Sequence, residues 1–129
     1  MPLRLTLKPH ERVIIGGAAV RNGGTPTALL VENQVPVLRE HDILSPRTVC
    51  TPCERVYLAL QLGYVDVEQR PTHFETYQRL ADEVRRAAPS CGPILDRIDE
   101  QLAAGNPYQA LKAGRWLRRH EQELLQHVS

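Results

Sequence analysis

The hydrophobic pattern of this chain changes its period near residue 50, and this change constrains the fold more than any other feature. Before it, short apolar runs alternate with polar residues or are β-branched, and glycine or proline separates them. After it, apolar residues recur at the spacing of an α-helix. The pattern predicts an α+β fold, with a small antiparallel β meander or barrel-like unit over residues 1–50 and about four helices over 51–129. In a chain of 129 residues, the two regions are expected to form one compact unit.

The first region contains four or five candidate strands. Leu3, Leu5 and Leu7 alternate with polar residues, which is typical of a half-buried strand. Glycine pairs at 16–17 and 23–24 are the residues expected at turns. We therefore expect one antiparallel meander, with strands at about 3–7, 13–15, 18–20, 28–31 and 35–38.

The second region opens with the clearest helix start in the chain. Thr51 is expected at the N-cap, Pro52 in the first turn, and Glu54 at the position that closes a capping box. Thr72 and Glu75 repeat the spacing and predict a second box. The remaining helix ends are predicted from proline, glycine and asparagine residues, which are common at the first and last positions of helices. The four helices are expected over about 52–67, 73–88, 93–104 and from 107 onward.

The charged residues are distributed unevenly. The net charge is only +1, and of the sixteen cations all but Lys8 and Lys112 are arginines. Residues 1–50 carry six cations against four anions, whereas residues 51–129 carry ten against eleven, so the β region is the mildly positive half. Arginine suits phosphate groups and stacks on bases. A GC-rich genome would also favour arginine codons, and this explanation is preferred for most of them.

The candidate binding site consists of five cations of the β region. They are Arg4 and Lys8, expected on one face of the first strand, and Arg12, Arg21 and Arg39, expected at strand ends or turns. Cations on the outer face of a small sheet can hold an RNA backbone. Against this, outward strand positions are polar in any case, and charge at a sheet edge prevents aggregation. Every aromatic residue also follows residue 56, so the usual stacking platform is missing.

A second group of cations lies in the last predicted helix. Its members are Lys112, Arg115, Arg118 and Arg119. This stripe could contact phosphates, but a solvated face paired with Glu121 and Glu123 is the preferred interpretation. Trp116, the only tryptophan, falls just beside the apolar line of the helix and is expected at a core edge or as an interface anchor.

The cysteines and the catalytic motifs favour no enzyme. Cys50 and Cys53 have CxxC spacing, but a zinc site would need further ligands such as Cys91, His41 or His73, and a redox site would need a thioredoxin-like context. Two ordinary cysteines near a helix cap are the preferred interpretation. No GxSxG, P-loop or GxGxxG motif is present. We expect no catalytic residues, no metal and no cofactor.

The same sequence predicts a soluble, cytoplasmic protein. No apolar run approaches the length of a membrane span, so no membrane contact is expected. The first residues lack the basic and apolar regions of a signal peptide. Three cysteines, an odd number, argue against a disulfide framework.

Three blocks of sequence carry a resemblance to a known family. They are residues 3–23 with Leu-Lys-Pro-His-Glu-Arg-Val-Ile-Ile, the block Leu-Val-Glu-Asn-Gln-Val-Pro-Val-Leu-Arg-Glu from residue 30, and Thr-Pro-Cys-Glu-Arg-Val-Tyr-Leu-Ala-Leu-Gln-Leu from residue 51. Together they resemble FlbT, a family of small flagellin-regulating proteins of alphaproteobacteria, most strongly over residues 1–66. The resemblance implies a post-transcriptional regulator that associates with the 5′ untranslated region of flagellin messenger RNA and promotes its decay. Some members of the family act as activators, and a partner protein, FlaF, works with or against it.

Two hypotheses follow from the residues and the resemblance. The first is a non-enzymatic repressor, monomeric or homodimeric, that binds the flagellin mRNA leader through the β region. The second is a chaperone-like adaptor that contacts flagellin or another flagellar regulator through its helices and affects the mRNA indirectly. In the adaptor, the contact side chains would be Tyr64, Tyr77 and Trp116.

Overall fold

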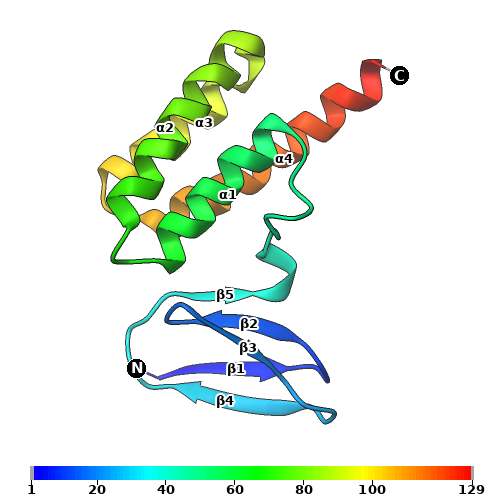
Figure 1. Ribbon diagram of the computed structural model, residues 1–129, viewed down its shortest axis with the longest axis vertical. Helices are drawn as coiled ribbons and strands as arrows, with labels where there is room; N and C mark the ends of the chain where they lie inside the picture. Colours follow the sequence, from blue (N-terminus) through cyan, green and yellow to red (C-terminus); the bar gives the residue numbers. More distant parts are fainter. Residues whose placement is uncertain (1, 129) are drawn as a thin grey trace. The chain divides into compact units, whose positions relative to one another are not determined.

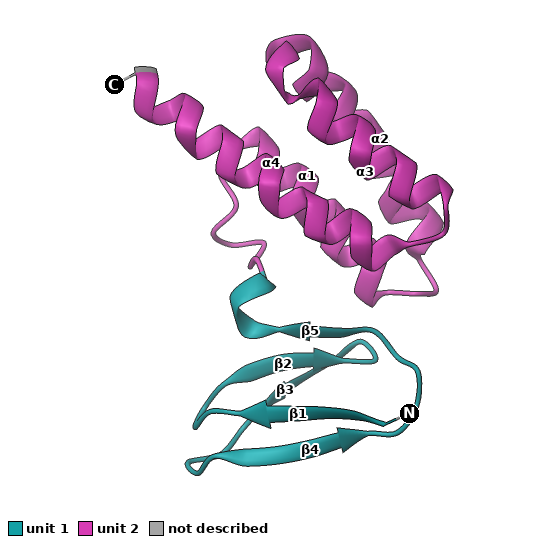
Figure 2. Ribbon diagram, turned by 180° about the vertical axis from the view of Figure 1, so that it is seen from behind, with its two compact units in different colours: residues 1–43 teal, residues 44–129 magenta. Residues whose placement is uncertain are grey.

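The computed structural model describes residues 2–128 and confirms an α+β fold, with five strands followed by four α-helices (Figure 1). The chain forms two compact units, Met1–Ile43 and Leu44–Ser129 (Figure 2). The division falls just after a short 3-10 helix, Glu40–Asp42, and before the change of period near residue 50.

The β unit contains two small sheets and not the single meander that the sequence predicts. Strand β1 (Leu3–Leu7) pairs antiparallel with β4 (Thr27–Val31). Strand β2 (Arg12–Ile15) lies between β3 (Ala18–Arg21) and β5 (Val37–Arg39), antiparallel to both. Only β2 and β3 therefore form a hairpin of consecutive strands, whereas β1 pairs with a strand far along the chain.

Asn22 explains this pairing. Its side-chain amide donates to the carbonyl oxygens of Lys8 at 2.8 Å and Thr25 at 2.9 Å, and more weakly to that of Leu7. These bonds join the turn after β3 to the end of β1, so β4 leaves the turn beside β1. A turn was predicted at this position, but the partners of its side chain lie up to 15 residues away.

The predicted turn between β2 and β3 is confirmed. Gly16 and Gly17 both have positive φ angles, 58° and 86°. A two-residue hairpin turn with this geometry matches the right-handed twist of the strands and favours glycine at both positions.

All five strands contribute to one apolar core within the β unit. Leu5, Leu7 and Val13 are buried at its centre. Partly buried side chains from the other strands pack around them: Ile15, Val20, Leu29, Val31 and Val37. Each fully buried leucine is worth about 1.5–3 kcal/mol. Leu3 does not share this burial, because 48% of its side chain is exposed at the start of β1.

The second unit is a bundle of four helices. They are α1 (Pro52–Val65), α2 (Arg70–Ala87), α3 (Gly92–Ala103) and α4 (Pro107–Val128). Helix α1 packs against both α2 and α4, and α3 packs against α4. The interior contains fully buried side chains from every helix, including Tyr57, Tyr77, Leu95, Ile98, Leu111 and Leu117. None of the helices described over residues 2–128 is long and apolar enough to cross a bilayer.

The first predicted capping box is confirmed and the second is wrong. Thr51 accepts a hydrogen bond from the Glu54 backbone, and the Glu54 carboxylate accepts one from the Thr51 backbone. Helix α2, by contrast, begins at Arg70, so Thr72 lies inside its first turn. Arg70 sets this start, because its guanidinium donates to the carbonyls of Gly63 and Tyr64 that end α1.

The predicted ends around α3 and α4 agree closely with the structure. Gly105 has a φ of 78°, the left-handed conformation typical of a residue that follows a helix. Asn106 precedes α4, and its carbonyl accepts a hydrogen bond from the Ala110 backbone at 3.1 Å. The loop between the two helices is therefore short, as these residue types indicate.

Candidate nucleic-acid interface

Four of the five predicted cations of the β unit are exposed. They are Arg4, Lys8, Arg12 and Arg21. Within residues 2–128, no carboxylate lies within 4.0 Å of these four side chains, since the ion pairs of that region involve other residues. Their positive charge is therefore available to a ligand.

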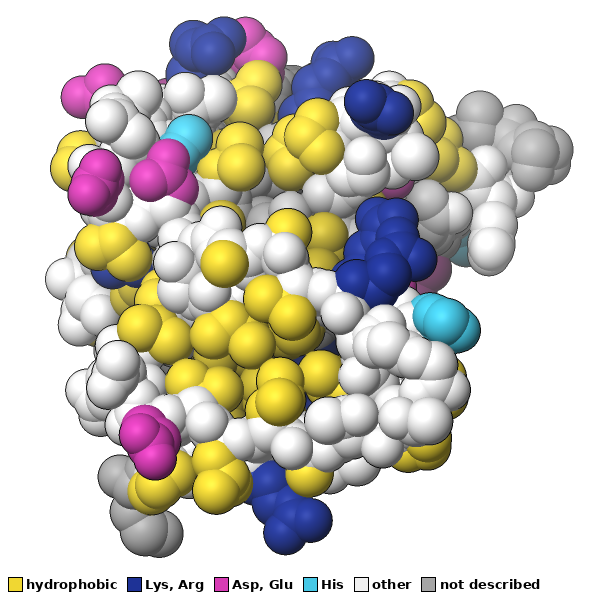
Figure 3. Space-filling view, turned by 60° about the horizontal axis from the view of Figure 1, so that its bottom comes forward, with side chains coloured by type: hydrophobic (Ala, Val, Ile, Leu, Met, Phe, Trp, Pro, Cys, Tyr) yellow, Lys and Arg dark blue, Asp and Glu magenta, His cyan; other side chains and the backbone are white. Residues whose placement is uncertain are grey.

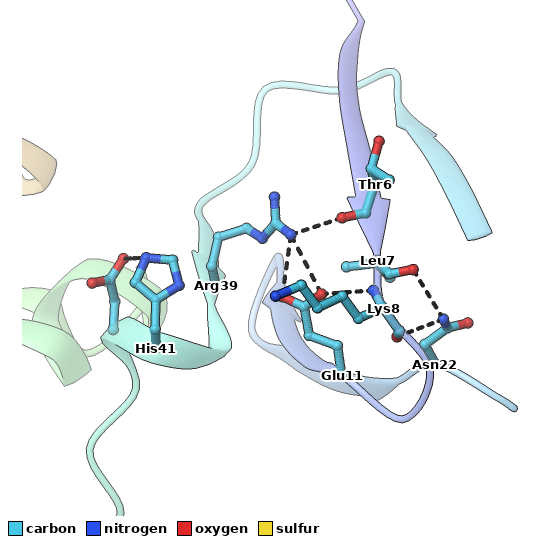
Figure 4. A network of polar contacts seen from close by, with 8 residues as sticks. Thr6, Leu7, Lys8, Glu11, Asn22, Arg39 and His41 are labelled. Carbon is cyan, nitrogen blue, oxygen red and sulfur yellow. Dashed lines mark hydrogen bonds and ion pairs between the residues drawn. The ribbon is translucent and has the colours of Figure 1, made fainter. Parts of the chain in front are cut away.

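Arg39 is different, because its guanidinium is held inside the β unit. Its Nη2 donates to the backbone carbonyl of Thr6 at 2.8 Å and forms an ion pair with Glu11 at 3.1 Å (Figure 4). Arg39 lies opposite Val13 in the β2–β5 register, so its side chain leaves the strand on the inner face. The contact joins the two sheets, and this arginine is a poor candidate for binding phosphate.

Glu11 is held as an anion at this junction. Only 10% of its side chain is exposed. The backbone N–H of Lys8 donates to its carboxylate at 2.8 Å, and this bond, together with those from Arg39, lowers the pKa of Glu11 below its ordinary value. The hydrogen-bonded carboxylate therefore neutralises Arg39 and also fixes the turn between β1 and β2.

Arg12 and Arg21 form the one close pair among the exposed cations of the described β unit. They lie directly opposite each other on β2 and β3. Next along the same face come Ile14 and Ala19, and these residues line a hollow of about 300 Å³ together with Ile43. Like charges placed opposite each other repel, so an anion between the two guanidinium groups would relieve an unfavourable contact.

The two other exposed cations lie apart from this pair. Arg4 is opposite Leu30 on the outer face of the β1–β4 sheet, and 65% of the Leu30 side chain is exposed. Lys8 follows the end of β1, in the turn. The two sheets turn their inner faces to a shared core, so their outer faces point in different directions. The structure thus divides the predicted site into an Arg12–Arg21 pair, two single cations, and an internal Arg39.

A second cationic surface lies on helix α4. We call it the basic–aromatic surface, and it consists of Lys112, Arg115, Trp116 and Arg119. These side chains line a hollow of about 410 Å³. The Trp116 side chain is 59% exposed, and the Arg119 guanidinium lies 5.5 Å from the centre of its ring.

The sequence-based expectation that Glu121 belongs to a solvated face of this helix is wrong. Glu121 is buried, with 8% of the residue exposed. Its carboxylate accepts hydrogen bonds from the Thr51 hydroxyl and from the Cys53 backbone N–H at 3.1 Å. It stabilises the N-terminus of α1, where a negative charge is favourable. The basic–aromatic surface could have been identified from the sequence, because Trp116 and its neighbouring cations follow helical spacing.

Figure 3 shows how the charges are distributed over one face of the molecule. Lys and Arg side chains lie in separate groups on the face shown, and apolar side chains form a larger continuous area. Within the residues described there, no continuous basic patch covers this face. On the face shown, the cations therefore form small groups and not a broad positive field.

The aromatic residues of the adaptor hypothesis differ in exposure. Tyr77 is fully buried, and its hydroxyl donates to Asp99 at 2.7 Å, so it cannot contact a partner. Tyr64 is partly buried and lies 5.4 Å from the Tyr108 ring. Trp116 alone among the three is well exposed.

The cysteines give no support to a redox or metal site. All three are free, and only Cys50 is exposed. A hydrogen bond to Glu54 raises the pKa of the Cys50 thiol, and burial raises that of Cys53 and Cys91. Protonated thiols are poor nucleophiles and poor metal ligands. Among the described residues, no group of three or more His, Cys, Asp or Glu side chains could hold a metal ion.

Comparison with known proteins confirms the resemblance found in the sequence. Residues 3–125 match the FlbT family, described as "Flagellar protein FlbT". The chain is 41% identical to a probable flagellum biosynthesis repressor protein FlbT 1 of Bradyrhizobium diazoefficiens, over 96% of this chain and 85% of that protein. It is 38% identical to a probable repressor of the same name from Rhodopseudomonas palustris, over 97% of this chain and 98% of that protein.

A third relative extends the match to the whole chain. The flagellum biosynthesis repressor protein FlbT of Caulobacter vibrioides is 34% identical, over 100% of this chain and 93% of that protein. No solved structure matches. These relatives are named as repressors and not as enzymes. With the family match spanning nearly the full sequence, the chain belongs to the FlbT family of flagellar proteins.

Proposed function

We propose that this protein is a cytoplasmic repressor of flagellum biogenesis that binds the 5′ untranslated leader of a flagellin mRNA and promotes its degradation. The names of its relatives support the repressor role. The observation that carries RNA binding is the pair of unneutralised arginines, Arg12 and Arg21, on adjacent strands. The protein cleaves no bond itself. It holds the leader and leaves it open to the cell's nucleases.

The chemistry of the pair suits a flexible single strand. Each guanidinium offers a planar set of donors that matches a phosphate group. The floor of the neighbouring hollow is apolar, formed by Ile14, Ala19 and Ile43, and can accept the face of an unpaired base. Arg4 and Lys8 would contact phosphates further along the strand. Phosphate contacts of this kind position the RNA, whereas contacts to the bases specify its sequence.

Two charge-matched variants test the proposal. The first changes Arg4, Lys8, Arg12 and Arg21 to Gln, which takes the net charge from +1 to −3. The control makes the same charge change at four exposed helical arginines: Arg55, Arg79, Arg86 and Arg97. Binding of a labelled flagellin leader is measured by fluorescence anisotropy, with a scrambled leader for comparison. We expect the β-unit variant to lose a much larger share of its affinity for the leader than the control does. Equal losses in the two variants would contradict a site in the β unit.

One observation favours a second candidate function, a protein-binding adaptor. Leu30 and Leu3 are exposed apolar residues on the β1–β4 sheet, and both strands of that sheet are edges. Exposed edges and apolar side chains suit a protein partner, which could be flagellin, FlaF or a second copy of this chain. The adaptor would show little affinity for the leader at any salt concentration. Purified flagellin or FlaF would instead bind directly, and Leu30→Lys would abolish that binding.

A further inference from the structure

We infer that the basic–aromatic surface of α4 is a second RNA-binding site, which stacks an unpaired base on Trp116 and holds the adjoining phosphates with Lys112 and Arg119. The inference rests on the proposed function for the source of the RNA. It concerns a different unit of the protein and different residues. It also supplies the aromatic side chain that the β unit lacks.

The helical spacing brings the four side chains of this surface to one face. Residues three and four positions apart are neighbours on a helix surface, and the four residues follow positions i, i+3, i+4 and i+7. The opposite face of α4 forms the interior contact, through Ala110, Leu111 and Leu117, which are fully buried. Trp116 is therefore not used by the core, although tryptophan is usually highly buried.

The composition of the hollow identifies the ligand. Among the described residues, three cations and one aromatic ring line it, whereas Glu54 and Glu121 line a neighbouring hollow that Arg115 and Arg119 also border. Proteins that bind single-stranded nucleic acid combine these two elements, cations for the backbone and a ring for the base. Arg119 lies 5.5 Å from the centre of the Trp116 ring and Lys112 lies 5.7 Å from that of Tyr108, so cations and rings are already in contact. An acidic peptide would use the cations but would leave the exposed indole without a partner.

Trp116 is the only tryptophan of the chain, so its fluorescence reports on this surface alone. The first experiment titrates the 129-residue chain with a twelve-nucleotide oligouridylate, and with polyglutamate as an anionic control. We expect saturable quenching by the RNA and not by polyglutamate. Two phosphate contacts, from Lys112 and Arg119, should weaken the RNA affinity about sevenfold between 50 and 200 mM salt.

Variants separate stacking from charge. Trp116→Leu should weaken binding of a labelled oligouridylate about fivefold or more, whereas Trp116→Phe should keep part of the affinity. Changing Lys112 and Arg119 to Gln should weaken binding, whereas the same change at two exposed arginines of α2 and α3, Arg79 and Arg97, should not. Circular dichroism checks that each variant folds, and the exposure of Trp116 favours folding of its variants.

The outcomes distinguish this inference from the proposed function. If the flagellin leader binds but Trp116 is not quenched and its variants bind normally, the inference is overturned and the proposed function stands. If oligouridylate quenches Trp116 while the β-unit variant binds the leader normally, the α4 surface is supported and the β-unit site is overturned. Equal quenching by polyglutamate would overturn RNA as the ligand. Absence of binding to any RNA would overturn both.

Discussion

The most direct prediction concerns the salt dependence of leader binding and how each cation contributes to it. For single-stranded nucleic acid, the logarithm of the binding constant falls with the logarithm of the salt concentration by about 0.7 for each phosphate contact. The four exposed cations of the β unit should therefore contribute a slope of roughly −2.8, or about a 50-fold loss of affinity between 50 and 200 mM salt. The quadruple Gln variant should lose this part of the slope.

Arg12 and Arg39 form a matched pair for this measurement, since both are arginines of the β unit. Arg12 has no carboxylate partner among the described residues, so Arg12→Gln should reduce the slope by about 0.7. Arg39 is already paired with Glu11 and bonded to Thr6. Arg39→Gln should leave the slope unchanged and should instead lower the stability of the β unit.

The measurement is a series of anisotropy titrations at four or more salt concentrations, with urea unfolding of each variant as the stability control. The reasoning fails if Arg39→Gln reduces the slope as much as Arg12→Gln does, because the internal ion pair would then not decide which cations reach the RNA. It also fails if the wild-type slope is shallower than about −0.7, which would correspond to a single phosphate contact.

Three further predictions test the packing and the charges. A Cβ added at Gly63 would lie 2.2 Å from the Phe74 ring, so Gly63→Ala should destabilise the helical unit by about 1–3 kcal/mol, less about 1 kcal/mol gained from helix propensity. The same substitution should become stabilising in a Phe74→Ala background, which removes the ring. As a control, Gly92→Ala should be neutral or stabilising, because a Cβ at Gly92 would lie in open space. Glu121→Gln should cost about 1–2 kcal/mol in urea unfolding, because the N-terminus of α1 loses a buried negative charge. The lowered pKa of Glu11 stabilises the fold at pH values above the ordinary carboxyl pKa, and this stability is lost as the pH falls through the lower pKa of the folded state. Amide NMR signals of the β unit should therefore shift or broaden in that acidic range, and Glu11→Gln should remove this dependence.

The parts of the fold that the sequence predicts correctly depend on neighbouring residues. The turn at Gly16 and Gly17 needs two positive φ angles, and glycine supplies both. The cap of α1 needs a hydroxyl at Thr51 and a carboxylate at Glu54, three residues apart. In each case the chemistry that forms the element lies within the element, so one sequence is enough to identify it.

The parts that the sequence does not predict depend on partners far along the chain. The two-sheet pairing depends on side-chain bonds of Asn22 to residues up to 15 positions away. The loss of Arg39 from the candidate site depends on Glu11, 28 residues earlier, and the burial of Glu121 depends on Thr51, 70 residues earlier. Spacing within one helix or strand carries no information on such pairs, so each charge was assigned to the surface by default.

For the proposed function, the charges that the fold leaves unpaired matter more than the net charge. With a net charge of +1, the whole molecule should have little attraction for a polyanion. The fold creates local positive charge because it pairs some arginines with carboxylates and leaves others unpaired. Arg85 is paired with Asp96 and Asp99. Arg12 and Arg21 remain exposed beside an apolar hollow. A small number of phosphate contacts gives only modest affinity for arbitrary RNA. Under the proposed function, selection of one leader would then come from contacts to unpaired bases, and for these the described residues offer the apolar floor at Ile14 and the ring of Trp116.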